Sequence, residues 1–65
     1  MTWKELRERI GLTTNEMARE LGMSKQLYSL KENYKRSMKL EEALAIQKIA
    51  ERNNLYIDLN DIRRS

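Results

Sequence analysis

The 65-residue sequence contains neither cysteine nor histidine. Without cysteine the chain forms no disulfide and offers no thiolate to a metal ion, and without histidine it lacks the commonest general base and metal ligand in proteins. It has no proline and only two glycines, which favours uninterrupted helices. No apolar run is long enough to span a bilayer, and no signal-peptide pattern follows Met1. We therefore expect a cytoplasmic helical protein with no membrane segment, no cofactor and no metal site.

Positive charge is concentrated in one part of the chain. The net charge is +3, yet residues 25–39 alone carry five basic side chains and one acidic side chain, which gives this segment a net charge of +4. Such an excess is the electrostatic footprint expected for a polyanionic partner, although a solvated basic loop would have the same composition. The segment is therefore a candidate nucleic-acid-binding surface.

The stretch from Thr13 onward has the pattern of two short helices joined by a tight turn. Thr13 followed three residues later by Glu16 is a capping box, in which each side chain accepts a backbone N–H of the first turn. Gly22 stands where a helix can end in the left-handed conformation, and Ser24 can cap the next helix. This arrangement is typical of a helix-turn-helix. The expected helices cover about Thr14–Leu21 and Ser24–Asn33.

Further helices are expected before and after this unit. Thr2 and Glu5 repeat the capping-box spacing at the start of a short helix that Gly11 ends. A longer helical pattern runs from Leu40 to Arg52, and its expected buried stripe is Leu40, Ala43, Leu44, Ile46, Ile49 and Ala50.

The segment Leu55–Leu59 allows two interpretations. Its apolar and polar residues alternate as in a short strand. A last helical turn capped by Asp58 or Asn60 and containing Ile62 fits the segment equally well, and it is the interpretation that we favour.

Several residues of the predicted helix-turn-helix occur in one register, namely Ala18, Leu21, Gly22, Ser24 and the pair Glu32-Asn33. With them the chain resembles the Cro and phage-repressor proteins, the XRE-type helix-turn-helix family, over roughly residues 2–62. The resemblance implies an all-α fold, a compact bundle of about five short helices that forms one lambda-repressor-like DNA-binding domain over residues 1–65. It also implies that the third helix lies in the major groove of double-stranded DNA.

The resemblance further implies which residues contact DNA. Family members read bases from the start of the third helix and about one turn later, and these positions are held here by Lys25, Gln26, Ser29 and Leu30. Gln26 can pair with adenine, Lys25 can donate to guanine or to a phosphate, and Leu30 suits a thymine methyl group. The family's phosphate contacts correspond here to Thr14, Asn15, Lys35, Arg36 and Lys39.

Two residues depart from the family pattern. Lys31 stands where the family commonly has an apolar core residue. Either its stem follows the edge of the core with the ammonium outside, or the helix rotates so that Leu27 and Leu30 take over the packing. Tyr34 stands where the family usually has glycine, so the turn needs another solution, such as Asn33 in the left-handed conformation.

The expected function is sequence-specific DNA binding by a small transcriptional regulator, such as a repressor of the phage or mobile-element type, without a small-molecule effector. Because one recognition helix reads few base pairs, a homodimer is a further expectation. Its candidate surfaces are the Leu55–Ile62 region and the outer face of the long helix.

Two other functional classes remain to be weighed. A protein-interaction module with the same fold but no DNA binding is the main alternative, and it would use a patch of Leu30, Tyr34 and Met38. An enzyme is disfavoured, because catalysis would depend on carboxylates or lysines that have structural positions on helix surfaces and caps.

Overall fold

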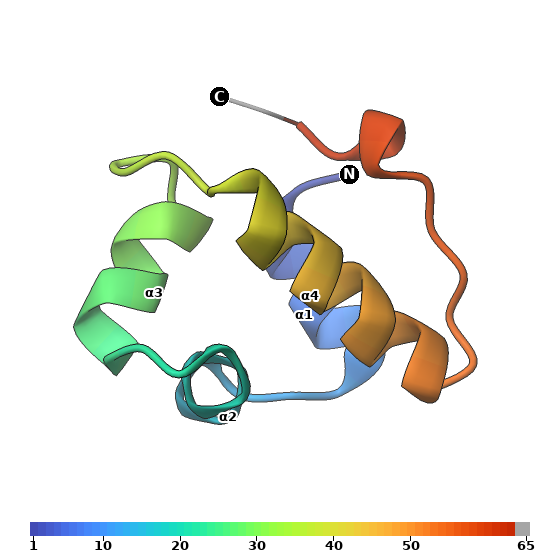
Figure 1. The fold of residues 1–65 in the computed structure, drawn as a ribbon, viewed down its shortest axis with the longest axis horizontal. Helices are drawn as coiled ribbons and strands as arrows, with labels where there is room; N and C mark the ends of the chain where they lie inside the picture. Colours follow the sequence, from blue (N-terminus) through green and yellow to red (C-terminus); the bar gives the residue numbers. More distant parts are fainter. Residues whose placement is uncertain (64–65) are drawn as a thin grey trace.

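Residues 1–63 are described in the computed structural model of the chain, and they form four α-helices and one turn of 3-10 helix (Figure 1). The elements are α1 (Trp3–Ile10), α2 (Thr14–Leu21), α3 (Lys25–Glu32), α4 (Leu40–Arg52) and the 3-10 turn η1 (Leu59–Asp61). The predicted all-α class is confirmed, whereas residues 1–63 contain four α-helices rather than five. Each helix in this part of the chain is too short or too polar to cross a membrane.

Side-chain caps determine where α2 and α3 begin. The Thr13 hydroxyl accepts the Glu16 N–H at 3.1 Å, and the Glu16 carboxylate accepts the Thr13 N–H at 2.8 Å, which completes the predicted capping box. The Ser24 hydroxyl accepts the Leu27 N–H at 3.1 Å. Gly22 ends α2 with a φ of 70°, a conformation that glycine adopts at little cost. These local contacts confirm the predicted connection from α2 to α3.

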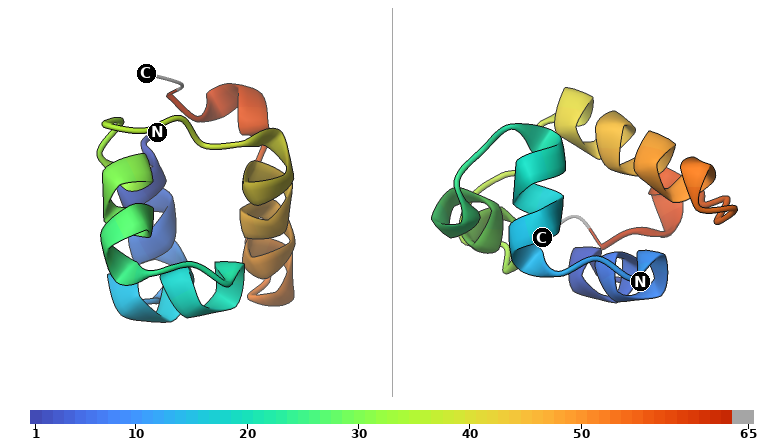
Figure 2. Two further views of the ribbon diagram at one scale, coloured as in Figure 1. Left: turned by 60° about the vertical axis from the view of Figure 1, so that its left-hand side comes forward. Right: turned by 90° about the horizontal axis from the view of Figure 1, so that it is seen from below.

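The four α-helices surround one hydrophobic core (Figure 2). Each contributes one large side chain that is fully buried: Leu6, Met17, Tyr28 and Ile46. Trp3 of α1 is buried as well. Because all four α-helices pack against one core, the orientation of α3 depends on the helices around it.

Two leucines of α4 lie outside this core. Leu40 is 72% exposed and Leu44 is 42% exposed, so the prediction that both belong to the buried stripe is wrong. The residues of α4 that are buried are Ala43, Ile46, Ile49 and Ala50. At about 100° per residue these four define a face from which Leu40 and Leu44 are turned away. The α4 helix therefore presents apolar side chains to solvent.

The chain between α4 and η1 is neither strand nor α-helix. Gln47 Nε2 donates to the Ile57 carbonyl at 3.1 Å, which holds this segment against α4. Asp58 then caps η1 by accepting the Asn60 N–H at 2.9 Å. The favoured interpretation, a last helical turn capped by Asp58, is confirmed as a single 3-10 turn, but this turn ends at Asp61 and does not contain Ile62.

Candidate nucleic-acid interface

One side of α3 carries an open groove of about 470 Å³. It is lined by Lys25, Gln26, Ser29 and Leu30, which the helical repeat places on one side of α3. Leu30 is 41% exposed, so α3 is not rotated to bury it. The structure thus brings all four predicted base-contacting residues together on a solvent-facing side of the helix.

Asn33 extends this side of α3 beyond the predicted set. Its Nδ2 donates to the Ser29 carbonyl at 2.8 Å and lies 3.3 Å from the Ser29 hydroxyl oxygen. The spacing of four residues from Ser29 is the signal that could have identified it, because residues at i and i+4 are neighbours on a helix surface. An exposed amide beside the groove adds a second group of the kind that pairs with bases.

The Lys31 side chain is buried, and its ammonium group forms an ion pair instead of lying in solvent. The residue is 6% exposed, and its Nζ donates to both oxygens of Glu42 at 2.5 and 2.8 Å. Burial by itself raises the pKa of Glu42, but hydrogen bonds from Lys31 and from the Lys39 N–H outweigh it and hold that pKa below its ordinary value. The prediction that the ammonium lies outside is therefore wrong, and so is the predicted rotation, since Leu30 stays exposed.

A second ion pair joins the same end of α3 to α1. Arg7 Nε donates to Glu32 Oε1 at 2.7 Å, and Arg7 Nη1 donates to the Leu12 carbonyl at 2.9 Å. The Tyr28 hydroxyl lies 3.4 Å from the same carboxylate oxygen, and burial followed by the charge of Glu32 raises the pKa of Tyr28. With Glu32 5% exposed, the end of α3 is anchored to α1 as well as to α4.

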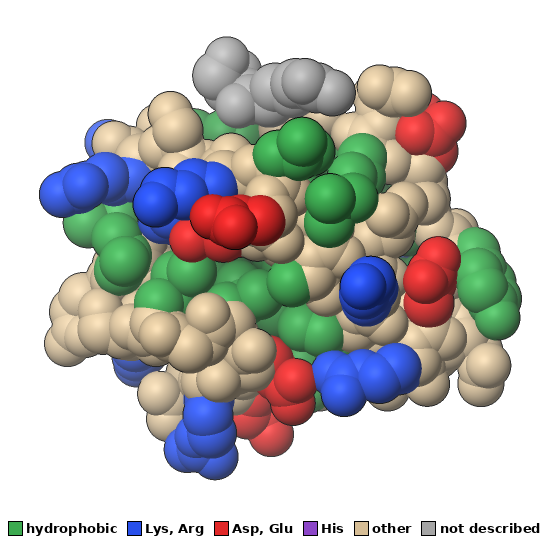
Figure 3. Space-filling model, viewed as in Figure 1, with side chains coloured by type: hydrophobic (Ala, Val, Ile, Leu, Met, Phe, Trp, Pro, Cys, Tyr) green, Lys and Arg blue, Asp and Glu red, His purple; other side chains and the backbone are tan. Residues whose placement is uncertain are grey.

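The predicted phosphate-contacting residues lie outside the groove, in two other segments. Thr14 and Asn15 occupy the first turn of α2, and Asn15 is exposed. The link between α3 and α4 (residues 33–39) carries the other three, and basic side chains gather over this corner of the molecule (Figure 3). Because Lys31 and Glu32 pair with other helices, the exposed charged residues within residues 25–39 are all cations: Lys25, Lys35, Arg36 and Lys39.

The second residue of the link has an unfavourable backbone conformation. Tyr34 has a φ of 61°, whereas Asn33 has a φ of −92°, so the suggested left-handed Asn33 is wrong. The Lys35 N–H donates to the Leu30 carbonyl at 2.8 Å, and the Tyr34 N–H donates to the Lys31 carbonyl at 3.2 Å. This Schellman pattern requires a left-handed residue one position after the helix cap, which is Tyr34. The conformation costs a non-glycine residue about 1–2 kcal/mol.

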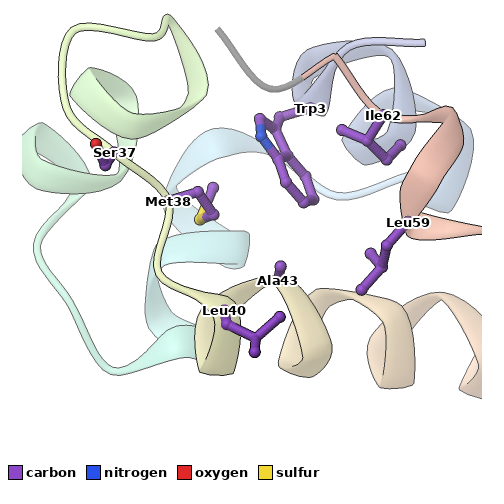
Figure 4. A pocket seen from close by; sticks show the side chains of 7 residues that line it. All are labelled: Trp3, Ser37, Met38, Leu40, Ala43, Leu59 and Ile62. Carbon is purple, nitrogen blue, oxygen red and sulfur yellow. The ribbon is translucent and has the colours of Figure 1, made fainter.

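A second cavity, of about 300 Å³, lies between the link, α1, the start of α4 and η1 (Figure 4). Its walls are Trp3, Ser37, Met38, Leu40, Ala43, Leu59 and Ile62. None of these side chains is an acid or a base, so the cavity offers no group for proton transfer. Leu30 and Met38, which the interaction-module alternative combines in one patch, line different cavities.

Comparisons with models of protein families, with curated proteins and with solved structures found no match to this chain. Any function proposed for it therefore has to come from its own residues and their geometry.

Proposed function

We propose that the protein binds double-stranded DNA sequence-specifically, as a small transcriptional regulator of the Cro and phage-repressor type. In this proposal α2 and α3 form a helix-turn-helix, and α3 enters the major groove. The observation that carries the proposal is the open groove lined by Lys25, Gln26, Ser29 and Leu30 on α3. These side chains combine donors, an amide and an exposed aliphatic group, which is the set needed to distinguish base edges in the major groove.

The anchoring of α3 supports the same proposal. Its last two residues, Lys31 and Glu32, form ion pairs with α4 and α1, while the residues that line its groove form no ion pair with another helix. A recognition helix that is already fixed at one end loses little conformational freedom when it binds DNA. Gln26 would then pair with adenine, Lys25 with guanine or a phosphate, and Leu30 with a thymine methyl group.

The surrounding charge would hold the duplex in place. The exposed cations Lys35, Arg36 and Lys39 follow α3 directly, and Thr14 and Asn15 offer hydroxyl, amide and backbone donors at the start of α2. Contacts of this kind go to phosphates, fix the orientation of the protein and carry no sequence information.

The direct test is an unbiased selection of DNA from a randomised pool by the purified protein. Enrichment of one short motif, bound with an affinity that falls steeply as salt rises, is the expected result. Binding without any enriched motif would contradict sequence-specific recognition. Absence of salt-dependent DNA binding would contradict the proposal as a whole and favour the interaction module.

Loss of Lys35 and Arg36 is expected to weaken binding to all DNA sequences alike. Each phosphate contact contributes about 0.9 to the slope of log affinity against log salt, so the Lys35→Ala/Arg36→Ala variant should have a slope smaller by about 1.8. Fluorescence anisotropy at several salt concentrations measures the slope. The matched control, Lys4→Ala/Arg9→Ala, removes the same charge from exposed positions of α1. Equal slopes for the two variants would mean that the link makes no phosphate contact.

We also propose a homodimer, formed through the outer face of α4. Leu40 and Leu44 are two exposed apolar side chains one turn apart on this face, whereas the other candidate surface exposes Tyr56 alone among its apolar residues and has Leu55, Ile57 and Leu59 partly packed against the core. Glu41 and Lys48 are exposed and seven residues apart. In an antiparallel pair of α4 helices related by a two-fold axis near Leu44, Glu41 of each copy would therefore face Lys48 of the other.

The dimer predicts a specific effect of charge at its centre. Leu44→Asp should abolish self-association in sedimentation velocity, because it would place two carboxylates beside the two-fold axis. Tyr56→Asp changes the exposed apolar residue of the other candidate surface and should leave self-association unchanged; loss of self-association in this variant would instead favour a dimer through Leu55–Ile62. Glu41→Lys should weaken the dimer, and Lys48→Glu in the same chain should restore it. A failure of this restoration would contradict the antiparallel arrangement.

A further inference from the structure

Tyr34 makes two contacts with a residue near the opposite end of the chain. Its hydroxyl donates to the Arg63 carbonyl at 2.7 Å, and Arg63 Cζ lies 5.1 Å from the centroid of its ring. Figures 1 and 2 show the last described part of the chain beside the link that follows α3. One aromatic side chain therefore joins the basic link to the C-terminal segment by a hydrogen bond and a cation–π contact.

The backbone conformation of Tyr34 indicates that these contacts matter. The Schellman closure of α3 needs only a left-handed residue, and glycine would satisfy it without strain. Tyrosine adds a ring, which packs partly against the core and lies beneath the Arg63 guanidinium, and a hydroxyl, which donates to the Arg63 carbonyl. Strained non-glycine residues persist where the surroundings hold them, and they occur preferentially at functional sites.

A second set of contacts holds Arg63 from the side of the N-terminus. The Arg63 N–H donates to the Met1 carbonyl at 2.7 Å, and the Met1 ammonium donates to the Asp61 carbonyl at 2.9 Å. Arg63 is thus placed between the start of the chain and Tyr34. Lys35 and Arg36 directly follow Tyr34, so three exposed cations from two distant parts of the sequence share one corner of the molecule.

We infer that Arg63 contacts a DNA phosphate and that Tyr34 is the positioning residue that sets it beside Lys35 and Arg36. This inference rests on the proposed DNA-binding function and extends its basic surface to the C-terminal segment. A guanidinium that lies over an aromatic ring keeps its five N–H donors, which can serve more than one partner. Phosphate oxygens accept such donors in short, charge-assisted hydrogen bonds.

The test compares Arg63→Gln, Arg63→Lys and Arg9→Gln in the full chain, with affinity for a random-sequence duplex measured at several salt concentrations. Arg63→Gln should lower the slope of log affinity against log salt by about 0.9. If the variant and the wild type bind equally at 1 M salt, the variant should then bind about 8-fold more weakly than the wild type at 0.1 M salt. Arg63→Lys keeps the charge and should restore the slope. Arg9→Gln, at an exposed position of α1, should leave the slope unchanged.

The role of Tyr34 has its own readout. Tyr34→Gly fits the left-handed backbone but loses both contacts to Arg63, so it should lower the slope, while relief of backbone strain offsets part of the core packing that the ring loses. Combining it with Arg63→Gln should produce no further loss, because both changes remove the same phosphate contact. Additive losses would overturn the positioning role of Tyr34.

Two further results separate the inference from the function on which it rests. An unchanged slope for Arg63→Gln, in a protein that binds DNA with the expected salt dependence, would overturn the inference alone. A wild-type protein without salt-dependent DNA binding would overturn the proposed function together with the inference.

Discussion

An Arg7→Met variant is expected to lose about 3–5 kcal/mol in its free energy of unfolding. Glu32 is 5% exposed, and Arg7 Nε donates to its carboxylate at 2.7 Å. Without Arg7 that carboxylate stays buried without its cation, which costs much more than an intact pair contributes. The Leu12 carbonyl loses its donor as well. Since 65 residues correspond to a total stability of about 3–10 kcal/mol, this loss would remove a large share of it.

Urea denaturation followed by circular dichroism measures this loss. Arg9→Met changes an exposed arginine of the same helix and should alter stability by no more than about 0.5 kcal/mol. A double variant, Arg7→Met/Glu32→Leu, should recover most of the loss, because no charge then remains buried without a partner. Equal stabilities for Arg7→Met and Arg9→Met would show that Glu32 does not depend on Arg7.

A Gln26→Ala variant is expected to bind its selected DNA site about 1–3 kcal/mol more weakly, which is roughly 5- to 150-fold. Gln26 is exposed in the groove of α3, so the change should leave the free energy of unfolding nearly unchanged. The loss should be confined to one base pair, because a bidentate amide reads a single adenine. A repeated DNA selection with the variant would identify that position.

Salt dependence provides the internal control for this variant. Gln26 is uncharged, so its loss should lower affinity for the selected site while the slope against salt stays that of the wild type. Affinity for random duplexes should hardly change. If the variant selects the same motif with the same preference at every position, Gln26 does not contact a base.

Local chemistry explains why most of the fold could be predicted from the sequence. The caps at Thr13 and Ser24 and the left-handed Gly22 depend on residues three or four positions apart, and all were confirmed. The bounds of α2 and α4 agree with the sequence pattern for the same reason, because helix periodicity and capping are both short-range signals. The clustering of the four candidate base-contacting residues follows directly from their spacing on α3.

The positions that were predicted wrongly have different physical causes. Lys31 was expected at the surface because the pattern does not reveal Glu42, which lies on another helix and pairs with it. The pattern likewise marked Leu40 and Leu44 as core, since apolar character alone does not show how far the buried face of α4 extends. The left-handed conformation was assigned to Asn33, because asparagine adopts it more readily than tyrosine. The hydrogen bonds that close α3 require it one residue later, at Tyr34.

The two buried ion pairs restrict the rotation of α3 about its own axis. Lys31 and Glu32 are adjacent, opposite in charge, and paired with Glu42 and Arg7 on different helices. A turn of α3 by one residue, about 100°, would bring Glu32 towards Glu42, or Lys31 towards Arg7. Either rotation replaces an attraction with a repulsion in a region of little solvent. The order lysine–glutamate therefore selects one rotational setting of α3, and with it the side chains that this helix turns towards solvent.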